Sequence, residues 1–214
     1  MIDFLEKSGR LEQARAETLS LKSVLPADAA VRKRTGHLLL GLGMAGDAAA
    51  VFRELLESDP VDAESQAGLG EAELALNHLL EAQAAFREAT RLQPGNPQYQ
   101  ARAQLLEEVV SMNPALPGLD VAERYKRSRR LLGTALAAFD QCREEKGREN
   151  SAANETAAAA SAALKSVRRP RSLGEATRTD INLAAGLWSE RGKLCGAPGP
   201  QDEALARAIA DASR

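Results

Sequence analysis

Histidine and cysteine, which often carry catalysis or hold metals, are scarce in this chain, with two of each. Its two histidines, His37 and His78, lie outside the spacings of zinc motifs and catalytic triads. The stretch "GLGMAG" at 41–46 is rich in glycine, but it joins two predicted helices, whereas a phosphate-binding loop follows a strand. We therefore expect no enzymatic activity and no cofactor or metal.

The two cysteines, Cys142 and Cys195, are a candidate disulfide in the C-terminal half of the chain. A bond between them would close a loop of about 53 residues and, in the loop-entropy model, stabilise the folded state by roughly 4 kcal/mol. It would indicate a periplasmic or exported protein, whereas two free thiols, one buried and one exposed, would indicate the reducing cytoplasm. We favour the bond because both cysteines lie where no sequence repeat supports the fold.

The composition favours helices as the elements that position these residues. Hydrophobic residues make up 44% of the chain and aromatic residues only 3%, with alanine and leucine prominent, whereas strands prefer β-branched and aromatic residues. The net charge of −2 provides no general attraction to nucleic acid or anionic lipid. No run of about 18 apolar residues indicates a membrane span.

The N-terminal half repeats itself at a fixed interval along the sequence. The period is about 34 residues, within the range typical of stacked supersecondary units. The matching pairs are Gly36 and Gly70, Ala48 and Ala82, Phe52-Arg53-Glu54 and Phe86-Arg87-Glu88, and Pro60 and Pro94. In each repeat, the glycine and alanine allow close helix packing, the phenylalanine fills the gap to the next unit, and the proline ends the second helix.

This pattern resembles the tetratricopeptide repeat, and the alanine-rich composition is similar to that of bacterial members. The resemblance implies an all-α, right-handed superhelix of stacked helical hairpins. The resemblance covers roughly residues 1–112. The predicted array spans 1–114, with a partial unit at 1–28, full repeats at 29–62 and 63–96, and a half unit at 97–114. The half unit has room for one helix because Pro114 follows Pro94 so soon.

Residues 115–214 are predicted to form a helical C-terminal cap without repeats. A Pro/Gly break at 115–120 precedes a long amphipathic helix at about 120–146. The alanine-rich segment 151–171 fits either a helix with a shallow contact or a mobile tether. Further helices are expected at about 172–193, after a capping box formed by Ser172 and Glu175, and at 201–213.

The resemblance also implies a binding groove lined by the first helix of each repeat. Its predicted lining consists of Lys33, His37, Leu40, Glu64, Ala67, Glu71, Leu74, Ala101, Arg102 and Leu105. Mixed charge with small and apolar residues suits a protein or peptide partner. The alternative is a hydrated inner face covered by the chain's own C-terminal helices.

A specialised groove of this family clamps a terminal carboxylate with lysine, asparagine and arginine side chains. Lys33 and Arg102 match two of its five positions, whereas His37, Gly68 and Gln98 depart from the pattern. We therefore do not predict binding of such a carboxylate.

The basic stretch "RYKRSRR" at 124–130 raises the question of a nucleic-acid, lipid or acidic partner. Aromatic residues that could stack on bases are not interleaved with its arginines. A solvated helix face is the favoured interpretation, and no nucleic-acid partner is expected.

These features together predict a non-catalytic scaffold or adaptor that binds a protein through the groove or the ends of the stack. Two alternatives remain open. The chain could be a self-associating structural subunit of a fibre or large assembly, since open-ended stacks can add to one another. It could also be the regulatory C-terminal part of a longer enzyme.

Overall fold

The computed structural model describes residues 11–23, 28–146, 151–166, 170–197, 199 and 202–214. Residues 1–10 and 24–27 of the predicted partial unit and 167–169 of the alanine-rich segment lie outside this description. The chain divides into two compact units, Met1–Leu106 and Glu107–Arg214. The division falls inside the helix α7 (Pro97–Met112) and so lies before the end of the predicted array at residue 114.

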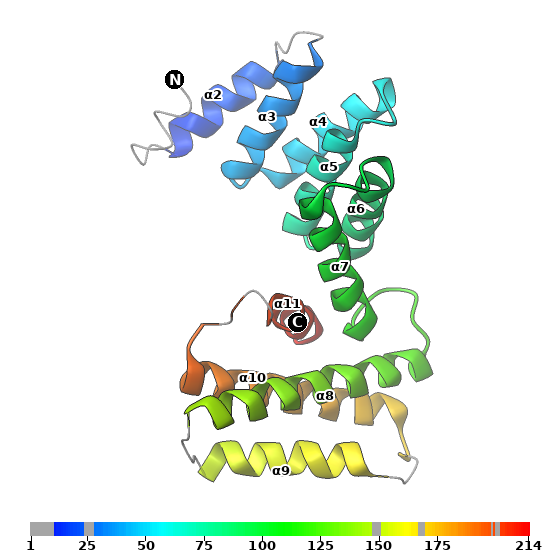
Figure 1. The fold of residues 1–214 in the computed structure, drawn as a ribbon, viewed down its shortest axis with the longest axis vertical. Helices are drawn as coiled ribbons and strands as arrows, with labels where there is room; N and C mark the ends of the chain where they lie inside the picture. Colours follow the sequence, from blue (N-terminus) through cyan, green and yellow to red (C-terminus); the bar gives the residue numbers. More distant parts are fainter. Residues whose placement is uncertain (1–10, 24–27, 147–150, 167–169, 198, 200–201) are drawn as a thin grey trace. The chain divides into compact units, whose positions relative to one another are not determined.

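Unit 1 is an all-α stack of helical hairpins (Figure 1). Consecutive helices from α2 to α6 pack against one another, and α3 also contacts α5 across one hairpin. This arrangement is the predicted helical solenoid. The helices are α2 (Leu11–Ser23), α3 (Ala29–Gly41), α4 (Ala45–Ser58), α5 (Ala63–Ala75), α6 (Leu79–Leu92) and α7 (Pro97–Met112), of which the last continues into unit 2.

The first helix of each repeat starts at a side-chain cap that recurs at equivalent positions. The carboxylate of Asp28 accepts hydrogen bonds from the Ala30 and Val31 amides, and that of Asp62 accepts one from the Glu64 amide. Asn96 does the same for α7, where its Oδ1 accepts from the amide of Gln98 at 3.0 Å. Such caps satisfy amides that have no partner inside the helix, so they fix the start of α3, α5 and α7.

The turn within each hairpin is built on one left-handed residue. Gly43 has φ +73° and the equivalent Asn77 has φ +61°, and these two residue types adopt this conformation most readily. The amides that follow, those of Met44 and His78, donate to the carbonyls of Leu39 and Glu73 at 2.8 Å. The two hairpins therefore turn in the same way.

The core of unit 1 depends on phenylalanines packed against glycines. The side chains of Phe52 and Phe86 are almost completely buried. A Cβ atom at Gly36 would lie 2.7 Å from the ring of Phe52, and one at Gly70 would lie 2.7 Å from the ring of Phe86. Because any larger residue would collide with these rings, the repeated pairing of glycine and phenylalanine sets the distance between helices.

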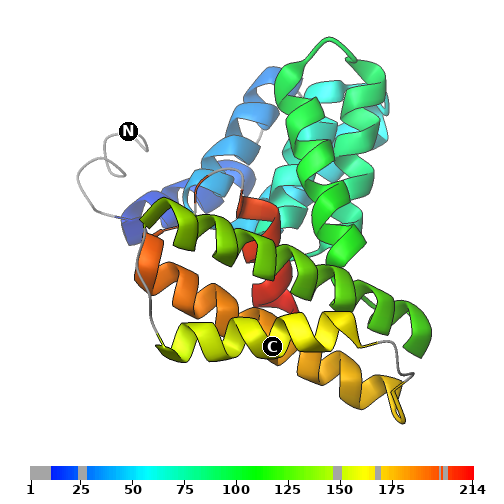
Figure 2. The ribbon, with the colours of Figure 1, turned by 60° about the horizontal axis from the view of Figure 1, so that its bottom comes forward.

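Unit 2 contains α8 (Val121–Lys146), α9 (Ser151–Lys165), α10 (Leu173–Cys195) and α11 (Glu203–Ala212). Helices α8, α9 and α10 lie side by side in both views (Figure 2). Ser128 near the start of α8 contacts Asp180 near the start of α10, and Cys142 near the end of α8 is bonded to Cys195 at the end of α10. These contacts show that α8 and α10 run parallel.

The helix α9 occupies most of the alanine-rich segment. Ala157 and Ala160 are buried, and α9 packs against both α8 and α10. The small side chains allow this close contact, although they bury little apolar surface. α11 buries Leu205, Ala208 and Ile209 and completes the unit against the same two helices.

Candidate partner-binding face

The first helices of successive repeats place charged side chains next to one another. We call the surface of α3, α5 and residues 97–106 of α7 the α3–α5–α7 face. Lys33 Nζ on α3 lies 2.7 Å from Glu64 Oε2 and 3.2 Å from Asp62 Oδ2. Arg102 Nε on α7 lies 2.9 Å from Glu71 Oε1 on α5. Acidic groups from α5 and its cap therefore pair with bases on both neighbouring helices.

Lys33 and Asp62 remain charged at neutral pH because each stabilises the other. The hydrogen bond to Glu64, with the bond to Asp62 and the charges of both carboxylates, outweighs burial and raises the pKa of Lys33. Burial alone would raise the pKa of Asp62. Hydrogen bonds from Ser65 Oγ and Lys33, together with the lysine charge, outweigh burial and lower it.

Tyr99 on α7 belongs to the same electrostatic environment. Burial is the main cause that raises the pKa of Tyr99, and the charges of Glu64 and Asp62 add to it. The phenol is therefore neutral at physiological pH. It extends the face from α5 to α7 as a hydrogen-bonding group.

The predicted groove residues divide into an exposed set and a buried set. His37 and Ala101 are exposed, and Leu40 and Leu105 are half-buried. Ala67 and Leu74 are only 8% and 5% exposed, so the expectation that they line an open groove is wrong for them. Their small or apolar side chains pack inside the stack, because α5 is covered by helices on both sides.

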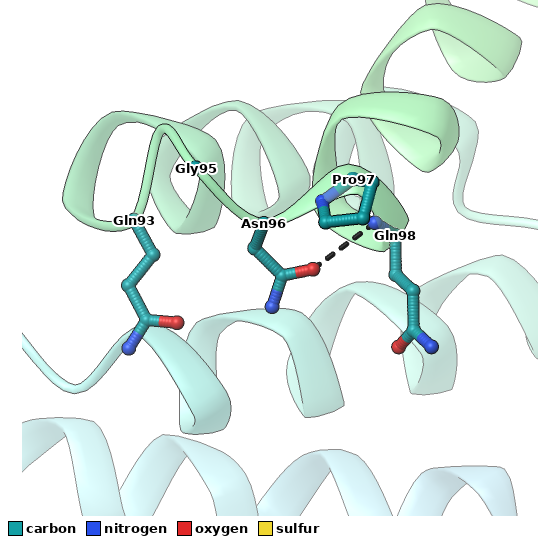
Figure 3. Close-up of a pocket in the computed structure, with 5 residues that line it drawn as sticks. All are labelled: Gln93, Gly95, Asn96, Pro97 and Gln98. Atoms are coloured by element: carbon teal, nitrogen blue, oxygen red, sulfur yellow. Dashed lines mark hydrogen bonds between the residues drawn. The ribbon is translucent and has the colours of Figure 1, made fainter.

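A hollow of about 680 Å³ lies at the loop between α6 and α7. Its lining includes three carboxamide side chains, Gln93, Asn96 and Gln98, which extend to the same side (Figure 3). Gln98 takes in α7 the place that Glu64 takes in α5, one repeat earlier. The hollow therefore borders the N-terminal edge of the α3–α5–α7 face and offers neutral hydrogen-bonding groups there.

A buried charge in unit 1 was not predicted. Glu73 is 2% exposed, although the equivalent residue of the preceding repeat is the core residue Leu39. Its carboxylate contacts Arg53 of the preceding repeat and lies 2.8 Å from His78 Nδ1 of its own repeat. The sequence does contain a signal for this buried acid: Glu73 is charged, whereas Leu39 at the same position of the preceding repeat is apolar.

The arginines at 124–130 have structural roles in unit 2. Arg124 donates to the carbonyls of Leu119 and Pro114, and Arg127 donates to that of Val110. Arg129 donates to the Ala163 carbonyl near the end of α9 and lies 3.5 Å from Asp180. These contacts replace the expected solvated face, because the guanidinium groups satisfy carbonyls at helix ends and loops.

Asp180 is the buried acid at this end of unit 2. It is 3% exposed and borders a cavity of about 380 Å³. Ser128 Oγ donates to its Oδ2 at 3.0 Å. Burial raises the pKa of Asp180 despite this bond and the charge of Arg129.

Within the described residues, the structure contains no group of three His, Cys, Asp or Glu side chains arranged to hold a metal. None of the described helices combines the length and the apolar composition that crossing a membrane requires.

Residues 39–105 match the family model of the tetratricopeptide repeat. The match supports a tetratricopeptide-like repeat segment in unit 1. The match covers most of both predicted full repeats and includes Glu64, Glu71 and Arg102 of the α3–α5–α7 face. Among curated proteins, none matches the chain.

Proposed function

We propose that this chain is a non-catalytic scaffold or adaptor that binds a protein partner through the α3–α5–α7 face. The observation that carries this proposal is the alignment of charged side chains from consecutive tetratricopeptide repeats on one surface. Such repeats generally mediate protein–protein interactions, and extended repeat surfaces suit peptides or helices.

The charged groups of the face lie on its accessible side. Glu64 and Glu71 stand two turns apart on α5, whereas Ala67 and Gly68 between them are buried, Gly68 against the ring of Phe52. A partner segment can therefore reach the carboxylates from outside the stack. The neutral amides around Gln98 add hydrogen-bonding capacity at the edge.

The disulfide supports a proposal about the compartment. The Sγ atoms of Cys142 and Cys195 are bonded at 2.00 Å, with their Cα atoms 6.1 Å apart. Disulfides persist in oxidising surroundings such as the bacterial periplasm or the cell exterior. We therefore propose that the chain and its partner occur in such a compartment.

A photo-crosslinking experiment tests the face directly. A photoreactive amino acid replaces Ala101 on α7 or, as a matched control, Ala84 on α6; both alanines are exposed, and they lie on different helices. Each variant is irradiated in native extract, and the crosslinked proteins are identified by mass spectrometry.

We expect a defined protein to be crosslinked from position 101 and not from position 84. The same proteins captured from both positions would contradict a role for this face. Crosslinks between copies of the chain alone would favour the structural-subunit alternative instead.

A further inference from the structure

The charges on the α3–α5–α7 face are unequal. Two carboxylates, Asp62 and Glu64, share the single ammonium group of Lys33, at 3.2 and 2.7 Å. The second pair, Glu71 and Arg102, is balanced one to one. Two carboxylates therefore face one ammonium group here, and the imidazole of His37 lies beside them, with its Nε2 3.9 Å from Glu64 Oε1.

The bases near this site are already engaged. Arg32 of α3 pairs with Glu54, and Arg34 also has an interaction partner. The helix α5 contains no lysine or arginine. An incoming carboxylate would have to displace an acid of the chain from its base before it could bind.

In the first pair the acid is the more accessible member, because the side chain of Glu64 is 52% exposed and that of Lys33 is 22% exposed. Glu71 and Arg102 are exposed to a similar extent, 38% and 36%. Glu71 follows Glu64 by two helical turns, which separates the two positions by about 10 Å along the axis. A ligand that approaches α5 therefore meets two carboxylates at this spacing.

The surrounding unit has the same sign. Residues 1–106 contain 15 acidic and 11 basic residues, a formal charge of −4, whereas the whole chain carries −2. Charge complementarity steers association and selects partners. The unit as a whole therefore repels acidic segments and attracts basic ones.

We propose that the partner presents a basic segment with two cationic side chains, which bind Glu64, together with Asp62, and Glu71. This inference rests on the proposed function, since it names the chemistry of the partner at the same face. The first cation competes with Lys33 for the shared carboxylates. The second cation binds Glu71, which also pairs with Arg102.

Labelled peptides with a fixed spacing of charges test this inference with the full chain. The probes are 12-residue peptides with two lysines, two glutamates or two glutamines in an otherwise identical neutral sequence, placed three or seven residues apart. Three residues span about 10 Å in an extended chain, and seven span about the same distance in a helix. Binding is measured by fluorescence anisotropy at low ionic strength, where exposed charges are little screened.

We expect a dilysine peptide to bind about five- to tenfold more tightly than the diglutamate peptide of the same spacing, as two partly exposed ion pairs allow. Glu64→Gln with Glu71→Gln should abolish this preference. The matched control, Glu57→Gln with Glu81→Gln, removes the same charge from exposed positions of unit 1 and should leave the preference intact. Lys33→Gln should strengthen dilysine binding by about two- to fivefold, because it removes the competing cation.

Preferential binding of the diglutamate peptide, absence of binding by every peptide, or equal losses in both double variants would overturn the inference. The proposed function fails separately, when position 101 crosslinks no specific partner. A specific partner at position 101 combined with a preference for acidic peptides would leave the scaffold role standing and refute only the basic segment.

Discussion

The two units hold their helices together in different ways. In unit 1, each described helix up to α6 packs against its neighbour in the sequence, and equivalent caps, turns and Phe–Gly contacts recur from one repeat to the next. In unit 2, the tying contacts join distant residues: Ser128 to Asp180, Cys142 to Cys195, and Asn113 to Asp211, the last pair 98 residues apart. Repetition supports the first unit, and individual long-range contacts support the second.

This difference indicates which charged residues of each unit can change without loss of stability. A repeat stack draws its stability from many equivalent interfaces, so its surface is free to carry the unequal charges of the α3–α5–α7 face. Unit 2 uses its charged residues internally, and Arg124, Arg127 and Arg129 are tied to backbone carbonyls. The surface charges of unit 1 are therefore the better source of specificity for a partner.

The largest expected effect comes from removing a repeated contact in unit 1. Phe52→Ala should lower the free energy of unfolding of unit 1 by about 4 kcal/mol, because it leaves a cavity between α3 and α5 that Gly36 and Gly68 cannot fill. Urea unfolding followed by far-ultraviolet circular dichroism measures the loss. Val61→Ala, at a side chain that is 65% exposed, is the control and should change the stability by less than about 0.5 kcal/mol. A loss below about 1 kcal/mol for Phe52→Ala would show that the repeated contact is not what holds the stack.

Removing the covalent contact of unit 2 should have a comparable or slightly smaller effect. Cys142→Ala with Cys195→Ala should destabilise this unit by up to about 4 kcal/mol, because the unfolded chain regains the freedom of the open loop. The fluorescence of Trp188, the single tryptophan, follows unfolding of unit 2 in urea. The parent chain treated with dithiothreitol should match the double variant. Two free thiols in the denatured, unreduced parent would refute the bond.

The smallest expected effect is the pH dependence that Asp180 gives to unit 2. Since burial raises the pKa of Asp180 in the folded state, its contribution to stability is complete below the usual value of 3.8. The contribution is lost as the pH rises through the raised pKa. The free energy of unfolding of the parent, minus that of Asp180→Asn, should therefore fall over this interval and then level off. Urea titrations of Trp188 fluorescence at several pH values measure it, and a difference that rises with pH would mean that Ser128 and Arg129 dominate instead.

The sequence predicts the helices of unit 1 well, because the features that define them recur. Equivalent residues such as Phe52 and Phe86, or Gly36 and Gly70, appear once in each repeat, so a single pattern identifies both hairpins. The helices of unit 2 follow from amphipathic spacing and the Ser172 cap, which accepts from the Glu175 amide in the structure.

The details of the site are less predictable. The resemblance places Lys33, Glu64 and Arg102 on one face, but which acid meets which base depends on how α3, α5 and α7 stack. Ala67 and Leu74 were expected at the surface, because a position in the repeat pattern does not reveal how deeply neighbouring helices cover it. The role of Arg127 could not be foreseen either, since it donates to a carbonyl of another helix, α7.

The burial of Glu73 restricts the order in which these repeats can occur. Its carboxylate needs His78 from its own hairpin and an arginine from the hairpin before it, at the position of Arg53. Arg87 occupies that same position in the second repeat. A gene duplication could therefore copy the second repeat directly behind itself, and the carboxylate equivalent to Glu73 in the copy would still have an arginine to pair with. The same repeat could not begin an array, because no preceding hairpin would supply the arginine.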